Sequence, residues 1–453
     1  MSLQNTSPIS QGADSFKAPL RGALLLGADS GATLAERLRA VQNGAKVVNG
    51  AEPTAPAEAD LRAPERLAID YADGAELADK LAKALRALAA DQPAMWKALR
   101  AQGIFHGCGP APKVAFLYPG QGSQYVNMLQ TLRTTEPIIA ETFDEADRVM
   151  MALLGKPLSD FIFVDGSDSA AVAKAEESLG QTAITQPAVL TADLAITRLL
   201  AAYGIGPDMT MGHSLGEWGA LIASGGIAFD DALQTVSARG HEAVDVVMEQ
   251  GAMAAVLAPL EEIERTVKAV SGYLVIANIN SYHQAVIGGQ SGAVEQAIAM
   301  FQTAGYDAFP VPVSNAFHTA IVAPYSDALR ETMKRVRLQS PRIPIVANVG
   351  GEFYPSGPDA VPQMIEVLAQ QLASPVQFVK GLLTLYDAGA RVFVEVGPKK
   401  ALQGFAEDVL GSRGDVVSLF TNHPKFGDGM AFNQALCGLY AAGLGAGIPA
   451  SSA

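Results

Sequence analysis

The sequence predicts an α/β protein in which a largely parallel sheet carries a smaller inserted lobe. Strand-like segments alternate with helical segments through residues 113–250, and this alternation is typical of parallel sheets. Residues 251–313 then follow the order β-α-β-β-α-β, the split motif of ferredoxin-like lobes. Strand-like segments return at residues 344–348 and 391–396, so we interpret the middle stretch as an insertion into the main sheet.

Length and composition limit the class of protein. The chain has 453 residues, 49% of them hydrophobic and 17% charged, which predicts two to four compact units. A net charge of −14 with no cluster of Lys and Arg to offset it argues against non-specific nucleic-acid binding. No apolar run approaches the length of a membrane span, and the N-terminus does not resemble a signal peptide. We therefore expect a cytoplasmic protein.

The sequence gives no indication of a cofactor. Cys108 and Cys437 form no disulfide framework, and no spacing of His, Cys and carboxylates predicts a metal site. There is no P-loop, and Gly120-Gln-Gly122 fails as a dinucleotide fingerprint because Tyr125 occupies the third glycine position.

The N-terminal part is expected to contain a separate small unit. Residues 1–20 are polar and without pattern, so we interpret them as a disordered lead-in. Within residues 21–112, strands at 22–26 and 66–70 each precede a helical pattern, at 33–41 and 77–88. Residues 49–65 are rich in Ala, Pro and Glu, which favours a surface loop.

The main body is expected to begin with a strand at 114–118 that runs into a glycine-containing turn at 119–124. A buried helix is predicted at 188–203, and a single further helix at 430–441 is predicted beyond Gly411. The inserted lobe is predicted to contain strands at 252–257, 273–279, 284–288 and 307–313, with helices at 260–270 and 293–304.

Gly212-His213-Ser214-Leu215-Gly216 is a GxSxG placed where a strand runs into a helix. A serine on so sharp a turn projects its hydroxyl away from the sheet, and the following helix directs its first N–H groups toward the site. The pattern alone fits an ordinary strand-to-helix turn equally well.

A serine nucleophile needs a base, and His318 is the best placed of the six histidines. It follows the inserted lobe, at the point where the chain returns to the main body and can overlook a cleft. His213 adjoins the serine and is expected to line the pocket wall. The acids between Ser214 and His318 fall mostly on helices, so a backbone carbonyl is a better orienting group than a third carboxylate.

Arg239 lies at the border of an apolar helical stripe, where an unpaired guanidinium would be costly. Its partner is either a carboxylate of the protein or a carboxylate of the substrate, held by the guanidinium fork.

Taken together, five segments resemble the acyltransferase domain of polyketide and fatty-acid synthases, a family that includes free-standing malonyl-CoA:acyl carrier protein transacylases. They are YPGQGSQ at 118–124, GHSLGE at 212–217, Arg239, NAFH at 315–318 and VEVGP at 394–398. The resemblance covers residues 113–410 and implies an α/β-hydrolase-like large subdomain at 113–250 and 314–410, with the ferredoxin-like subdomain at 251–313 between them.

The flanks resemble the linkers of modular family members, at 21–112 after a ketosynthase and at 411–453 after the acyltransferase. The chain is therefore expected to be a piece of a larger synthase, most similar to iterative systems such as polyunsaturated fatty-acid synthases.

The resemblance also implies roles for individual residues. Ser214 would be acylated, His318 would be the general base, and the main-chain carbonyl of Gln371 would orient that histidine. The backbone N–H groups of Gln121 and Leu215 would form the oxyanion hole.

For the acyl group, the resemblance implies that Arg239 holds the free carboxylate of malonyl and that His213 lines the pocket. Phe317 would crowd a 2-methyl group, which favours malonyl, although Asn315 departs from the histidine usual at its position.

The implied substrates are malonyl-CoA and the phosphopantetheine thiol of an acyl carrier protein, with an adjacent ketosynthase as a further partner and no cofactor. Two other classes remain open on the sequence. A serine hydrolase of the α/β type predicts a strand-end acid and activity on simple esters. An inactive docking module predicts disruption of Ser214, His318 or the oxyanion turn, all of which the sequence retains.

Overall fold

The computed structural model describes residues 16–44, 53–90, 92–245, 251–313 and 315–449, with the side chains of residues 239–245 left out. Most of the predicted lead-in, residues 1–15, lies outside these residues. Two compact units are present. The first contains Met1–Pro110, Ala202–Ile205 and Leu439–Ala453, and the second contains Ala111–Ala201 and Gly206–Gly438.

The first unit has a three-stranded antiparallel sheet in the order β1-β2-β3. Its strands are β1 (Gly22–Ala28), β2 (Glu65–Tyr71) and β3 (Ile104–Cys108), and its helices are α1 (Gly31–Gly44), α2 (Glu58–Arg62), α3 (Gly74–Ala90) and α4 (Pro93–Arg100). Leu34 and Leu38 of α1 and Leu81 of α3 pack on Leu67 and Ile69 of β2. The two predicted strands and both helices are present, but α2 forms within the stretch expected to be a loop.

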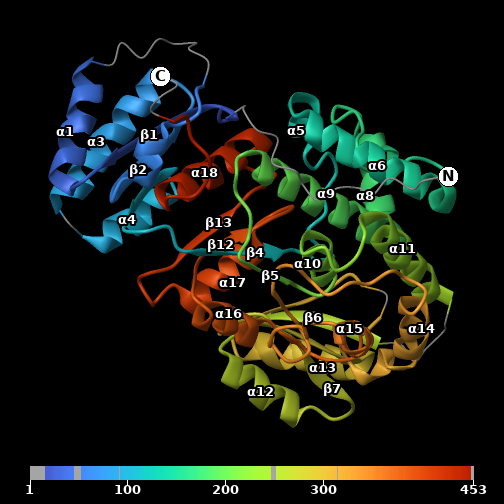
Figure 1. Ribbon diagram of the computed structural model, residues 1–453. Helices are drawn as coiled ribbons and strands as arrows, with labels where there is room; N and C mark the ends of the chain where they lie inside the picture. The colour runs from blue at the N-terminus through green and yellow to red at the C-terminus, as the bar shows by residue number, and fades with distance from the viewer. Residues whose placement is uncertain (1–15, 45–52, 91, 246–250, 314, 450–453) are drawn as a thin grey trace. The chain divides into compact units, whose positions relative to one another are not determined.

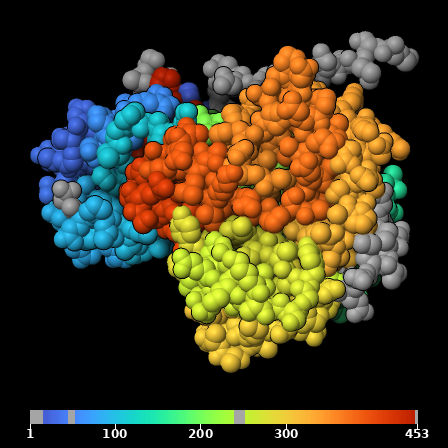
Figure 2. All heavy atoms as spheres, turned by 90° about the horizontal axis from the view of Figure 1, so that it is seen from below, coloured from blue at the N-terminus to red at the C-terminus, as the bar shows by residue number. Residues whose placement is uncertain are grey.

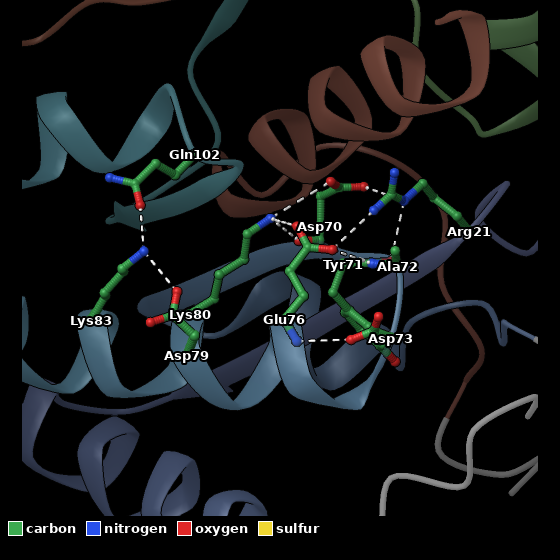
Figure 3. Close-up of polar contacts among 10 residues, drawn as sticks. All are labelled: Arg21, Asp70, Tyr71, Ala72, Asp73, Glu76, Asp79, Lys80, Lys83 and Gln102. Atoms are coloured by element: carbon green, nitrogen blue, oxygen red, sulfur yellow. Dashed lines mark hydrogen bonds and ion pairs between the residues drawn. The ribbon is translucent and has the colours of Figure 1, made fainter. Parts of the chain in front are cut away.

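Buried charges connect the sheet of this unit to α3, as Figure 3 shows. Lys80 donates to the main-chain oxygen of the fully buried Asp70 at 2.6 Å and pairs with Glu76 at 2.7 Å. Arg21 lies 3.2 Å from the Asp70 carboxylate. Burial acts to raise the pKa of Glu76, but hydrogen bonds from Lys80 and the Ala72 N–H outweigh it and hold that pKa below its usual value. Each buried charge in the cluster therefore has an opposite charge beside it.

The second unit is built on a parallel five-stranded sheet in the order β10-β5-β4-β12-β13, seen near the centre of Figure 1. The strands are β4 (Lys113–Tyr118), β5 (Met209–Gly212), β10 (Ile345–Val346), β12 (Ala390–Glu395) and β13 (Val417–Phe420). The sequence predicted a parallel sheet but only a helix beyond Gly411. That part was incomplete, because the short β13 completes the sheet beside β12.

Helices cover both faces of this sheet. Phe378 and Leu382 of α16 and Leu402 of α17 pack with Leu117 and Phe393 on one face. On the other face, Tyr118 meets α9, where its hydroxyl lies 3.1 Å from Thr197 Oγ1. Alternation along β4 sends Leu117 and Tyr118 to opposite faces. The helices of this part are α5 (Gln130–Thr135), α6 (Pro137–Leu154), α7 (Ser159–Ile162), α8 (Ser169–Leu179), α9 (Thr182–Ala202), α10 (Gly216–Ala223), α11 (Phe229–Asp245), α14 (Pro324–Met333), α15 (Ala360–Gln371), α16 (Phe378–Asp387), α17 (Ala401–Leu410) and α18 (Asp428–Ala441), with a 3₁₀ turn at Ala320–Val322.

The inserted lobe has the predicted ferredoxin-like order. Its elements are β6 (Gly251–Leu257), α12 (Leu260–Ala269), β7 (Leu274–Ile279), β8 (Gln284–Gln290), α13 (Ser291–Thr303) and β9 (Asp307–Pro310). The sheet order is β11-β7-β8-β6-β9, where β11 (Val376–Gln377) comes from the main body and pairs in parallel with β7. In Figure 2 the lobe, yellow-green to yellow, projects below the orange surface of the main body.

One face of the lobe packs on its two helices, and the other faces the main body. Ile263, Val294 and Phe301 form the helix-side core. On the opposite face, Met253 and Ala277 pack with residues just after β9, among them Phe317. The lobe therefore positions the segment that carries His318. Among the residues described, no helix is both long enough and apolar enough to cross a membrane.

Candidate active site

The elbow between β5 and α10 holds Ser214 in a left-handed conformation with φ of 53°. This conformation is strained for a residue with a side chain, and such strain persists only where the surroundings enforce it. Tight packing around the elbow provides that enforcement. A Cβ added at Gly212 would lie 1.9 Å from the Gly216 carbonyl carbon, and one at Gly216 would lie 2.0 Å from the Tyr118 oxygen. Both glycines of the GxSxG pattern are thus required by backbone contact.

Ser214 and His318 are brought together from positions 104 residues apart. Ser214 Oγ lies 2.7 Å from His318 Nε2. On the other side of the ring, Nδ1 lies 3.0 Å from the Gln371 oxygen and 3.2 Å from the Ser374 oxygen. Both of these atoms are acceptors, so Nδ1 carries the proton and Nε2 accepts the serine O–H. Both acceptors at Nδ1 are main-chain carbonyls, the kind of acceptor expected from the sequence.

The same elbow is held by Asn348, which follows β10 at the edge of the sheet. Its side-chain oxygen accepts the Ser214 N–H at 2.7 Å, and its side-chain nitrogen donates to the Gly212 oxygen at 2.6 Å. A single amide thus bridges the strained residue and the end of β5. The contact helps to maintain the left-handed backbone at Ser214.

A buried carboxylate, Glu217, connects the residues that hold the pair. Glu217 Oε2 accepts the Asn348 N–H at 3.2 Å and the Gln371 side-chain nitrogen at 3.0 Å. Its Oε1 accepts the Tyr354 hydroxyl. The side-chain nitrogen of Gln371 also donates to the main-chain carbonyl oxygen of Ser214 at 2.7 Å. Burial, together with the charge and hydrogen bond of Glu217, raises the pKa of Tyr354 well above its usual value.

Two backbone N–H groups beside the serine have no hydrogen-bond partner within the described chain, those of Gln121 and Leu215. The loop after β4 lies directly against the elbow, because a Cβ at Gly120 would be 2.4 Å from the His213 oxygen and 3.4 Å from the Leu215 nitrogen. Unsatisfied donors are rare in folded proteins. Here they flank the nucleophile, as a site for a developing oxyanion requires.

His213 points away from the serine hydroxyl toward the lobe. Its Nε2 lies 2.7 Å from Asn280 Oδ1, in the turn between β7 and β8. Its ring also lies 5.4 Å from that of Phe378, measured between centroids. Burial lowers the pKa of His213, so it is neutral near pH 7. The side chain therefore joins the elbow to the inserted lobe.

The predicted acyl-binding residues fall in two groups. Asn315 is buried and Phe317 half-buried, and both precede His318 in the segment that follows the lobe. Arg239 lies on α11, but its side chain is outside the described residues. No group of three or more His, Cys, Asp or Glu within the described ranges is placed to hold a metal ion.

Sequence reasoning missed Glu217, Asn348 and Tyr354. The sequence did contain a signal for Asn348, which ends a predicted strand where sites on parallel sheets gather. Glu217 directly follows the GxSxG and was missed because the search for an acid sought a direct partner of His318. No motif or spacing in the sequence around Tyr354 indicated a role for this residue at the site.

A parallel α/β core with a serine at its elbow bonded to a histidine defines an enzyme of the serine-nucleophile class. Within that class the chain belongs to the acyl transferase domain family, which matches residues 115–426.

Similar proteins agree with this family. The malonyl CoA-acyl carrier protein transacylase of Bacillus subtilis (strain 168) is 35% identical over 303 residues, which cover 66% of this chain and 90% of that protein. The spectinabilin polyketide synthase system protein NorB of Streptomyces orinoci is 33% identical over 336 residues, covering 74% of this chain and 15% of that protein. A solved complex of a type II polyketide acyl-carrier protein with its malonyl-transacylase contains a chain that matches this one with a TM-score of 0.60 and 31% identity. The match covers 68% of this chain and 95% of that chain.

Proposed function

We propose that this chain moves a malonyl group from malonyl-CoA to the phosphopantetheine thiol of an acyl carrier protein, for polyketide or fatty-acid synthesis. The transacylase relatives support the reaction. The observation that carries the mechanism is the 2.7 Å contact between Ser214 Oγ and His318 Nε2, with the opposite ring nitrogen held by carbonyls.

In the first half-reaction, His318 Nε2 takes the proton of Ser214 as the serine oxygen attacks the thioester carbonyl. The N–H groups of Gln121 and Leu215 donate hydrogen bonds to the carbonyl oxygen and stabilise the negative charge that develops on it. The intermediate then expels the CoA thiolate, which takes the proton from His318, and a malonyl ester remains on Ser214.

The second half-reaction reverses these roles. His318 removes the proton of the carrier thiol, and the thiolate attacks the malonyl ester through the same oxyanion site. Ser214 leaves and regains its proton from His318. The carbonyl acceptors of Gln371 and Ser374 keep the imidazole in one orientation during both steps.

Selection of the acyl group belongs to four residues in this proposal. Arg239 binds the free carboxylate of malonyl with its guanidinium fork. Phe317 crowds a substituent on the carbon between the two carbonyls, and Asn315 completes the pocket. His213 acts from behind the elbow, which its bond to Asn280 holds against the inserted lobe. An Arg239→Ala variant should lose its preference for malonyl over acetyl, and an unchanged preference would remove Arg239 from the proposal.

The wider context is a larger synthase. We propose that residues 21–112 form a linker after a ketosynthase and that residues 411–453 form the linker that follows. The similarity to NorB supports this context, since it extends over 336 residues against 303 for the Bacillus subtilis transacylase.

The direct test is the intact mass of the protein after exposure to a mixture of acyl-CoA thioesters. The parent should gain one malonyl group, and Ser214→Ala should gain none. Ser224→Ala is the matched control, because the hydroxyl of this buried serine, just after α10, donates to the Leu221 main-chain oxygen and to no other acceptor in the contacts described. Malonylated Ser214→Ala would refute the nucleophile. Rapid release of free malonate without a carrier would instead favour a hydrolase.

A further inference from the structure

A positively charged aromatic cluster lies beside the loop that carries Gln121. Its members, here called the lysine–aromatic patch, are Lys399, Lys400, Phe420, His423, Lys425 and Phe426. The first two follow β12, and the others follow or end β13, so the parallel pairing of these two strands brings both loops to the same end of the sheet.

The rings of the patch contact one another and one of the cations. Phe426 lies 5.2 Å from the ring of His423 and 5.7 Å from that of Phe420. Lys400 Nζ lies 5.2 Å from the Phe420 centroid and 5.7 Å from that of Phe426. Phe426 is nevertheless 37% exposed, so an aromatic face remains available at the surface. The cluster thus presents a cation next to a surface suited to stacking.

The cations of the patch, Lys399, Lys400 and Lys425, form no direct ion pair with Asp or Glu in the described parts of the chain. Two carboxylates on the same segments, Glu395 and Asp428, are both buried. Burial raises the pKa of Glu395, and the charge of Lys400 acts to lower it. Glu395 accepts the Gln403 N–H, and Asp428 accepts the Thr131 N–H.

His423 adds a neutral donor to these cations. Burial and then the charges of Lys400, Lys425 and Lys399 lower the pKa of His423. The Lys425 N–H donates to its Nδ1 at 3.2 Å, so the proton lies on Nε2. The patch therefore offers ammonium groups, an imidazole N–H and a ring face, which together fit a phosphorylated nucleotide.

The patch is joined to the catalytic loop by one side chain. Lys399 donates to the Gly122 oxygen at 2.8 Å, one residue after Gln121. Lys399 also has a left-handed backbone with φ of 67°, a strained conformation for a non-glycine residue. The two neighbouring lysines contact different targets, Lys399 the loop and Lys400 the aromatic rings.

We infer that the lysine–aromatic patch binds the 3′-phosphorylated ADP end of the coenzyme A thioester. This inference rests on the proposed function, which gives the acyl donor a long arm between its thioester and its nucleotide. With the thioester at Ser214, the nucleotide must contact protein surface away from the serine. The ammonium groups of Lys400 and Lys425 take the phosphates, while Lys399 remains bonded to the loop, and the exposed face of Phe426 stacks on the adenine. In a chain of net charge −14, this local positive field also draws an anionic donor toward the site.

The test compares two malonyl donors that differ only in the nucleotide end. Lys425→Glu combined with Phe426→Ala should raise the KM for malonyl-CoA roughly tenfold. The same variant should leave unchanged the KM for malonyl-pantetheine, which lacks the nucleotide, and the KM for the carrier protein. Lys334→Glu, just after α14, is the control for the change in charge, since Lys334 is exposed and its only ion pair in the contacts described is with Glu331.

Binding is also measured without turnover, with adenosine 3′,5′-bisphosphate as the probe in calorimetry. The parent should bind it, more weakly at high salt, and the Lys425→Glu/Phe426→Ala variant should lose most of that affinity. The binding measurement tests the patch even if the parent accepts malonyl from neither donor. That outcome would refute the proposed function but not the binding of the nucleotide.

Two results overturn the inference. Equal KM values for malonyl-CoA in the parent and the variant, with equal affinity for the bisphosphate, would make the patch a solvated surface. A raised KM for the carrier protein, with malonyl-CoA unaffected, would assign the patch to an acidic protein partner.

Discussion

Glu217 is a buried carboxylate whose removal should damage both stability and catalysis. Glu217→Ala removes an acceptor from three donors: the Tyr354 hydroxyl, the Asn348 N–H and the Gln371 side-chain nitrogen, of which the last keeps its bond to the Ser214 main-chain oxygen. A hydrogen bond to a charged group contributes about 1.5–3 kcal/mol. Water entering the vacated space replaces part of this, so we expect a net loss of about 3 kcal/mol.

The effect on catalysis follows from where these donors lead. Gln371 uses its side chain to bind Glu217 and its main-chain oxygen to orient His318. Asn348 likewise connects Glu217 to the Ser214 N–H. Loss of both connections loosens the nucleophile and the base together. A misplacement of about 1 Å costs roughly 100-fold in rate, and we expect the acylation rate to fall by that factor with little change in KM.

Glu217→Gln separates the hydrogen bonds from the charge. The new amide oxygen can face Asn348 and Gln371, while the amide nitrogen donates to the Tyr354 hydroxyl, which also accepts. We therefore expect a loss of about 1 kcal/mol or less. Adding Tyr354→Phe removes that acceptor, and the double variant should be much worse than either single one.

The assays are thermal unfolding and rapid-quench measurement of malonyl transfer to Ser214. If Glu217→Ala fails to fold, Glu217→Gln and its combination with Tyr354→Phe still give a result. An Ala variant with the parent's melting temperature and acylation rate would refute the reasoning. So would Gln and Ala variants of equal severity.

Three further predictions concern the fold around the site. Gly212→Ala should prevent the elbow from forming, because its Cβ would meet the Gly216 carbonyl carbon at 1.9 Å; the readout is loss of serine labelling together with a lower melting temperature, and normal labelling would contradict it. Burial raises the pKa of Glu395 from 4.5 to about 8, so the folded state retains a proton that the unfolded chain releases, and stability falls as pH rises through that window. Melting temperatures between pH 5 and pH 8 should therefore fall less in Glu395→Gln than in the parent, and equal slopes would show that Glu395 is not the group responsible. Asp408→Ala should loosen the β7–β8 turn by about 1 kcal/mol, because Asp408 accepts the His283 N–H at 3.1 Å and lies 2.8 Å from its ring nitrogen; hydrogen exchange at residues 280–284 should rise, and unchanged exchange would exclude the contact as a support.

Local patterns in the sequence were enough to predict most elements of the fold. A continuous apolar run identified the strand at 114–118, and leucines at helical spacing identified the helix at 77–88, since both signals depend only on near neighbours. The split β-α-β-β-α-β order likewise follows from element types in sequence. The strand at Val417–Phe420 was missed because four residues carry too little pattern, and its place beside β12 gives it a strand conformation.

By itself, the sequence determined the chemical groups at the site. Ser214 lies in a GxSxG that only a sharp turn accommodates, and His318 follows the lobe at the return to the main body. The absence of a suitable acid between them indicated a backbone acceptor, which the structure has at Gln371.

Only the tertiary structure decided how those groups are held and what surrounds them. Glu217 acts on residues more than 130 positions away in sequence, through contacts that no local pattern encodes. The sequence likewise shows Lys399 and Lys400 side by side but not their approach to Lys425, which lies on a separate loop. The pairing of β12 with β13 brings those loops together, and it does so because strand pairing joins segments by hydrogen bonding across space rather than by nearness in the chain.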